Sequence, residues 1–118
     1  MRLTVSGDGV RIGDKLHCDI DRRLEFALGR FGPAIRQVVV RVVDINGPRG
    51  GVDKRCRITV ALRGAGGSSI TVDYSDDDLY AAIMRACDRA ERAVRRTLER
   101  KRAKYGYHRR RMAEADAR

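Results

Sequence analysis

The residues best placed to do chemistry are five arginines near the end of the chain. They sit four, three, four and four residues apart, and on a helix that turns about 100° per residue they share one face. The five are Arg85, Arg89, Arg92, Arg96 and Arg100. We call this set the arginine row. Guanidinium groups gathered in this way form a binding surface for an anion such as phosphate.

The other residues of this segment are sorted by type as well. The apolar residues fall on a different face, and the acidic residues lie between the two faces on one side. The apolar set is Leu79, Ile83, Ala86, Ala90, Val94 and Leu98, and the acidic set is Asp88, Glu91 and Glu99. A helix that is merely solvated usually alternates the signs of its charges. The sorting therefore favours a binding surface over a plain surface helix.

The composition of the whole chain agrees with an anionic partner. Lys plus Arg number 26 against 16 Asp plus Glu, which gives a formal net charge of +10 and an isoelectric point near 10.4. The 118 residues, 42% of them hydrophobic, are enough for one domain with a modest core. Such a balance points to a nucleic acid or another polyanion.

The cysteines and the absence of long apolar runs indicate the compartment. The chain has three cysteines, so one must stay unpaired, and a secreted disulfide framework is not expected. No apolar run approaches a signal peptide or a membrane span of roughly 20 residues. We expect a cytoplasmic protein with no membrane partner.

The elements that must position the arginine row follow a β-α-β-β-β-α order. Alternating patterns predict strands over residues 2–6, 55–63 and 70–74, and a valine-dense run predicts an interior strand over 37–45. Helical spacing predicts a first helix, capped by Asp14 and ended by Gly32 and Pro33, and a last helix to about Lys104. The fold class is α+β, a four-stranded mixed sheet with both helices on one face. The first two strands should be parallel and the later ones antiparallel. We expect one domain over residues 1–104 and a flexible basic tail over 105–118.

No group of residues predicts an enzyme, a metal site or a cofactor. His17 and Cys18 are neighbours, but adjacent helical residues point about 100° apart, and no second ligand pair has zinc spacing. The glycine-rich segment 47–51 lacks the spacing of a phosphate loop and leads into a strand. Residues 76–78 are all aspartate, and their position before a helix favours capping over metal binding.

Two further features leave alternatives open. Phe26 projects from the first helix near Lys15 and Arg22, where it could stack on an exposed base or complete a contact under a loop. Four arginines alternate along the middle strands and form either a second basic surface or an ordinary solvated sheet face, which the alternation favours. They are Arg41, Arg55, Arg57 and Arg63.

Residues 1–102 resemble the ribosome hibernation promoting factor and ribosome-associated inhibitor family of bacteria. The likeness lies in the order of elements, in the Asp-Leu-Tyr-Ala-Ala-Ile segment at 78–83, and in the pairs Asp88-Arg89 and Glu91-Arg92. Segment 46–57 is similar to a divergent branch with an extended loop between the second and third strands. The chain looks like a short form, without the second, dimerisation domain of the long forms.

The resemblance implies a partner and a function. It implies binding to the small ribosomal subunit and its 16S-type rRNA, in the channel for messenger and transfer RNA, and inhibition of translation under stress or in stationary phase. No reaction is catalysed and no small-molecule substrate is involved; we expect a monomer when the protein is free. The family's basic positions carry over to Arg89, Arg92 and Arg96, extended here by Arg85 and Arg100. On the first helix the counterparts are Arg22, Arg23 and Arg30, although residues 24–29 replace a stretch that is usually richer in lysine.

Two other kinds of binding protein fit the same residues. Two helices on a small sheet could recognise double-stranded RNA by its shape. A basic helix could also dock on an acidic protein, as an older view of this family as modulators of an alternative sigma factor suggests. Nuclease treatment separates the last possibility, because a protein partner should survive it.

Overall fold

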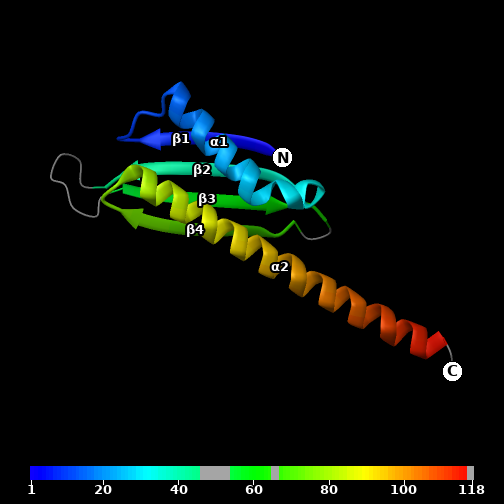
Figure 1. Ribbon diagram of the computed structural model, residues 1–118. Helices are drawn as coiled ribbons and strands as arrows, with labels where there is room; N and C mark the ends of the chain where they lie inside the picture. Colours follow the sequence, from blue (N-terminus) through cyan, green and yellow to red (C-terminus); the bar gives the residue numbers. More distant parts are fainter. Residues whose placement is uncertain (46–53, 65–66, 117–118) are drawn as a thin grey trace.

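The computed structural model describes the backbone of residues 1–45, 54–64 and 67–116, and the side chains as far as residue 104. In chain order the elements are β1 (Arg2–Asp8), α1 (Asp14–Leu28), the 3₁₀ helix η1 (Gly29–Ala34), β2 (Ile35–Asp44), β3 (Lys54–Leu62), β4 (Ser69–Asp76) and α2 (Leu79–Asp116) (Figure 1). The strands lie side by side in the order β1-β2-β3-β4. β1 is parallel to β2, and the other pairs are antiparallel. The predicted α+β fold with a mixed sheet is confirmed.

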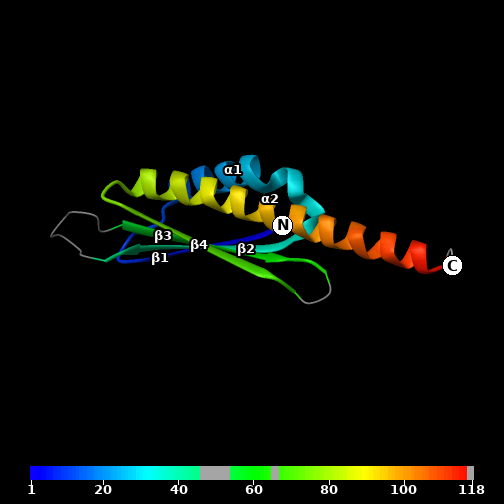
Figure 2. The same cartoon turned by 90° about the horizontal axis from the view of Figure 1, so that it is seen from below.

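Both helices pack on the same face of the sheet, as predicted (Figure 2). That face is apolar because the two central strands alternate strictly. Val38, Val40 and Val42 of β2, like Ile58 and Val60 of β3, are fully buried. The intervening residues point to the opposite face, which no helix covers. The alternation therefore decides which side of the sheet receives the helices.

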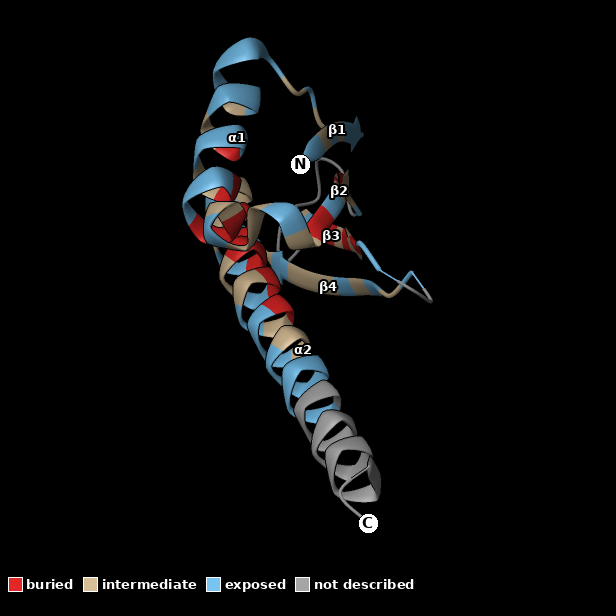
Figure 3. Ribbon diagram, turned by 90° about the vertical axis from the view of Figure 1, so that its right-hand side faces the viewer, coloured by how far each residue is buried: buried red, intermediate tan, exposed pale blue. Residues whose placement is uncertain are grey.

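The helices complete the core with their own apolar stripes. From α1 come Ile20, Leu24, Ala27 and Leu28, and from α2 come Ala82, Ile83, Ala86, Cys87, Ala90 and Val94. Their recurrence every three or four residues makes one stripe on each helix. The buried part of α2 lies over the sheet, and its later turns extend past the sheet (Figure 3). The rest of the α2 surface over the sheet is therefore free to present charge.

The start of α2 is fixed by aspartate capping, as expected for residues 76–78. The Asp78 Oδ1 accepts hydrogen bonds from the backbone N–H of Tyr80, at 2.9 Å, and of Ala81, at 3.4 Å. Asp76 Oδ1 accepts one from the backbone N–H of Asp78, at 3.0 Å, and this bond is the main cause of the lowered pKa of Asp76. These bonds satisfy N–H groups that have no partner within the helix.

Three predicted helix boundaries are wrong. Gly13, not Asp14, occupies the capping position of α1, without a side-chain bond; Asp14 is the first helical residue, where its charge suits the helix dipole. The α-helical geometry of α1 ends at Leu28, and the chain tightens into η1, which contains Pro33.

The predicted end of the last helix near Lys104 is also wrong, since α2 continues to Asp116. Ala, Arg, Met and Glu dominate this stretch, and their helix propensities outweigh the cost of a single glycine, about 1 kcal/mol. The side chains of the predicted tail lie outside the described residues. So does segment 46–53, which holds the glycine-rich loop.

Two of the three cysteines are buried in the core. Cys56 and Cys87 are fully inaccessible, whereas Cys18 is exposed on α1. Burial is the main reason why the pKa of each buried thiol rises from 9.0 to about 12. A neutral thiol is a poor nucleophile, so both should be inert in the folded protein.

We expect a maleimide or iodoacetamide reagent at about pH 8 to modify only Cys18 in the folded protein, and all three cysteines after unfolding.

The burial of Cys56 and Cys87 also makes the stability of the protein depend on pH. In the unfolded chain the thiols ionise near pH 9, but in the native protein they ionise only near 12. The free energy of unfolding should therefore fall as pH rises between these values. Urea denaturation of a variant with Cys56→Val and Cys87→Val isolates this contribution, because the variant should show a shallower fall.

Candidate functional site

The arginine row lies along the solvent side of α2, and all five side chains are exposed. Among the side chains that the structure describes, none of the five forms an ion pair with a carboxylate. Arg96 and Arg100 make only local hydrogen bonds to their own helix. Five positive charges on one helix face repel one another. Asp73 and Glu99 line the same groove, and Arg85 contributes to the lowered pKa of Asp76, but three nearby carboxylates do not balance five arginines. The excess of positive charge makes the row a receptor for an external anion.

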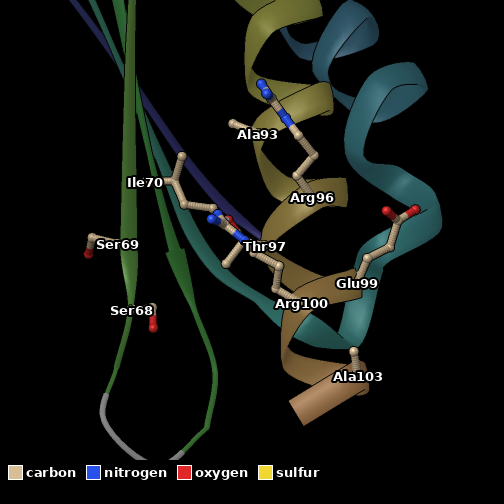
Figure 4. A pocket seen from close by; sticks show the side chains of 9 residues that line it. All are labelled: Ser68, Ser69, Ile70, Ala93, Arg96, Thr97, Glu99, Arg100 and Ala103. Atoms are coloured by element: carbon tan, nitrogen blue, oxygen red, sulfur yellow. The ribbon is translucent and has the colours of Figure 1, made fainter.

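The row borders a groove between α2 and the edge strand β4. One hollow is lined by Thr71, Val72 and Asp73 of β4 and by Arg89, Arg92 and Arg96 of α2. The next, of about 830 Å³, continues along the same side past Arg96 to Arg100 (Figure 4). In this view Ile70 of β4 points toward Thr97 and Arg100 of α2, whereas the Ser69 side chain points away from the helix. The arginines therefore line one side of a groove whose other side is β4.

Arg89 is held in place by β4. Its Nη1 donates a hydrogen bond to the backbone carbonyl of Asp73, at 3.0 Å, and its guanidinium lies over the Tyr74 ring, 4.9 Å from the ring centre. Such contacts restrict a long side chain before any ligand binds, so less conformational entropy is lost on binding. Arg89 is the fixed member of the row, while Arg85 and Arg92 extend into solvent.

Two of the three arginines predicted around the first helix form ion pairs with α2. The Arg23 Nη2 lies 2.6 Å from Asp88 Oδ1, and Arg30 is paired with Glu91. Arg30 also lies over the Phe31 ring, 4.7 Å from its centre. The structure brings both residues to α2, where they neutralise acidic side chains. Of the three first-helix positions expected to meet RNA, only Arg22 is exposed and outside these pairs.

We call the two ion pairs Arg23–Asp88 and Arg30–Glu91 the clasp between the helices. The sequence analysis did not predict these pairs, although the sequence contained one signal of them. The acidic residues of the last helix fall on one flank, and that flank turns out to face α1. Arg95 Nη1 also lies near Glu91 Oε1, at 3.6 Å, within the same helix. Asp88 and Glu91 thus hold the helices together, and the arginine row lies on the other side of them.

Phe26 is exposed over 80% of its surface, so the expected alternative of a contact under a loop is wrong. The neighbouring cation is Arg23, whose Cζ lies 5.5 Å from the ring centre. The ring borders a hollow between α1 and α2.

The uncovered sheet face carries partly compensated charges. Arg57 Nε lies 2.8 Å from Asp73 Oδ1, and Arg41 Nη2 lies 3.6 Å from Asp8 Oδ2. Arg55 and Arg63 are exposed. Pairing of this kind is typical of a solvated polar face, which is the interpretation that the alternation favoured.

The described residues hold no group of three side chains able to ligate a metal ion. His17 and Cys18 are both exposed on α1. Within the same residues, neither helix has the length and apolar character needed to cross a bilayer.

Comparison with known proteins shows which proteins share this sequence pattern and fold. Residues 3–102 match the model of a family described as sigma 54 modulation protein / S30EA ribosomal protein. The N-terminal domain of Protein Y from Thermus thermophilus has 26% sequence identity and a TM-score of 0.66, covering 82% of this chain and 99% of that one. A ribosomal subunit interface protein from Coxiella burnetii, at 18% identity and a TM-score of 0.56 over 84% of this chain and 99% of that one, shares the fold. A search of curated protein sequences gives no match.

The family model covers the sheet from residue 3 onward, α1 and the part of α2 that carries the arginine row. The order of strands and helices that the sequence predicted is also the order of the matched region. The resemblance is therefore confirmed, and the chain belongs to the sigma 54 modulation protein / S30EA ribosomal protein family.

Proposed function

We propose that this protein associates with the ribosome, binds the 16S-type rRNA of the small subunit in the channel for messenger and transfer RNA, and inhibits translation under stress or in stationary phase. The observation that carries the proposal is the arginine row, five exposed cations on a helix anchored by the core, none of them in an ion pair with a carboxylate among the described side chains. It acts by occupying the channel and catalyses no reaction.

The geometry of the row suits a phosphate backbone. Arg85 and Arg100 are 15 residues apart, so the row extends over about 22 Å of helix. Ribosomal RNA presents phosphates at high density over such a length, and arginine can bind a phosphate with two hydrogen bonds. Because the apolar stripe fixes α2 on the sheet, the row meets the RNA as a preorganised surface.

The relatives support the ribosome as the partner. The family description includes a ribosomal protein, and one structural neighbour is described as a ribosomal subunit interface protein. The neighbour with the higher identity, the Protein Y domain, aligns over nearly its whole length. The same family description also mentions sigma 54 modulation, which keeps an acidic protein partner as the second candidate.

A sucrose gradient of stationary-phase cells tests the proposal. We expect the tagged protein to sediment with small subunits, with whole ribosomes or with paired ribosomes, and to be released by nuclease treatment. Deletion of the gene should change the ribosome profile. Failure to sediment with any of these particles would contradict the proposal. Broad capture of duplex RNA would favour a general double-stranded RNA-binding module, and a partner that survives nuclease would favour an acidic protein.

The clasp between the helices gives a prediction that separates structural from binding arginines. The double variant Arg23→Gln/Arg30→Gln should lower the free energy of unfolding by no more than about 2 kcal/mol, because each of the two partly exposed ion pairs contributes at most about 1 kcal/mol. It should weaken binding to small subunits less than the matched variant Arg92→Gln/Arg96→Gln, which removes the same charge from the row. Filter binding and urea denaturation of both variants measure the two effects. Equal losses of affinity would show that the clasp arginines contact RNA directly.

A further inference from the structure

The exposed phenyl ring of Phe26 has no role in the surface described so far. It belongs to the solvent side of α1, and 80% of its surface is accessible. A phenyl ring exposed to this extent is available to stack on another planar group. The ring borders a hollow between α1 and α2, of about 240 Å³, lined also by Arg23, Ala27, Arg30, Asp88 and Glu91.

The charges of this hollow are balanced, in contrast to the arginine row. Its two arginines are paired with its two carboxylates, Arg23 with Asp88 and Arg30 with Glu91. A phosphate gains little from a neutral site and would be repelled by the carboxylates. The hollow instead offers hydrogen-bond donors and acceptors beside an aromatic face. A nucleobase is a planar ring with donors and acceptors on its edge, so its chemistry fits this arrangement.

The Arg23 guanidinium lies over the Phe26 ring, with its Cζ 5.5 Å from the ring centre, and thereby covers part of one face of the ring. The high exposure of the side chain leaves the rest of the ring surface open for stacking. Asp88 and Glu91 directly precede Arg89 and Arg92 of the row in the sequence. The hollow and the row are therefore neighbouring surfaces of α2, one toward α1 and the other toward β4.

We propose that Phe26 stacks on an unpaired base of the RNA whose phosphates contact the arginine row. The proposal rests on the proposed function and adds a site for a base to a surface otherwise made of phosphate contacts. Stacking of this kind tolerates any base, because each has an aromatic face.

Binding to purified small ribosomal subunits tests the site with three substitutions. Phe26→Ala should weaken binding by about 5- to 150-fold, which corresponds to the loss of about 1 to 3 kcal/mol for one stacked base. Phe26→Tyr keeps an aromatic face and should bind like the wild type. Phe26→Leu keeps an apolar side chain without an aromatic face and should bind like Phe26→Ala. Position 26 is solvent-exposed in the free protein, so circular dichroism should show an unchanged fold and melting temperature for all three variants.

Each other pattern has a definite meaning. If Phe26→Leu binds like the wild type, the ring makes an apolar contact with a ribosomal protein, and base stacking is wrong. If Phe26→Ala binds subunits as well as the wild type does, the site makes no contact, but the proposed function stands. If the wild-type protein does not bind subunits at all, the proposed function itself fails.

A direct measurement uses the absence of tryptophan from the chain. Phe26→Trp introduces a single tryptophan whose fluorescence a stacked base quenches. The probe is a single-stranded oligoribonucleotide of mixed sequence, titrated at low salt, with a blunt RNA duplex of the same length as control. Anisotropy of a dye on the RNA reports binding independently. We expect the single strand to quench the fluorescence and the duplex to bind without quenching; a single strand that binds without quenching overturns the stacking proposal.

Discussion

We expect replacement of Arg89, Arg92 and Arg96 by glutamate to abolish binding to the small ribosomal subunit. These three side chains line the groove beside β4 and carry no internal ion pair among the described residues. Each charge-assisted contact to a phosphate is worth about 1.5 to 3 kcal/mol, so loss of three corresponds to an affinity at least on the order of 1,000-fold lower. The introduced carboxylates also repel the RNA, which adds to the loss. Co-sedimentation and filter binding measure the effect.

The fold should survive this change, because the three side chains are exposed and lie off the apolar stripe of α2. The triple substitution does remove the contact of the Arg89 side chain with the Asp73 carbonyl and the Tyr74 ring. A second variant, Arg92→Glu/Arg96→Glu, leaves that contact intact and should still lose most of the affinity. The matched control is Arg11→Glu/Arg36→Glu/Arg63→Glu, which changes the net charge equally at exposed positions away from the groove. A folded triple variant of the row that still co-sediments would mean that a different face binds the ribosome.

The architecture could be predicted from the sequence because it depends on periodicities that are local. The buried residues of β3, from Cys56 to Leu62, alternate with more exposed ones, and the apolar residues of α2 recur at helical spacing, so the sequence indicates the buried face of both elements. The handedness and length of the connections then leave few ways to arrange four strands and two helices. The same logic located the arginine row, since residues on one helix face are fixed relative to one another by the helix itself.

The partners of charged residues could not be predicted in this way. Arg23 and Asp88 are 65 residues apart in the sequence, and their contact depends on how α1 and α2 are rotated and shifted on the sheet. A family resemblance places Arg23 and Arg30 among basic positions but does not say whether their charges are already neutralised. The contact of Arg89 with the backbone of Asp73 has the same origin, because no pattern in the sequence marks a carbonyl at a sheet edge.

The ends of the helices could not be predicted accurately from the sequence either, for a different physical reason. A helix stops where the balance of propensity, capping and packing changes sign, and that balance is small. At α1, the chain changes to 3₁₀ geometry before Pro33 rather than ending at the proline. At α2, good helix formers carry the backbone beyond the sheet to Asp116, although no periodic apolar stripe continues there.

We expect the affinity for small subunits to fall steeply with salt, with a log-log slope of magnitude roughly 3 to 5. Each phosphate that an arginine neutralises releases a fraction of a counterion, about 0.7 to 0.9, and the arginine row supplies five such contacts. Raising monovalent salt from about 50 to 200 mM should therefore weaken binding by ~60- to 1,000-fold. Competition filter binding over this range measures the slope.

Single substitutions show which residues contribute to the salt dependence of the affinity. Arg92→Gln should reduce its magnitude by about one, because it removes one phosphate contact. Phe26→Ala should shift the whole line to weaker binding with the same slope, because stacking on a base releases no counterions. Arg63→Gln, at an exposed position away from the groove, should leave both slope and affinity unchanged. A wild-type slope near 1 would contradict the row as the contact surface, because five guanidinium groups on phosphates cannot bind without releasing several ions.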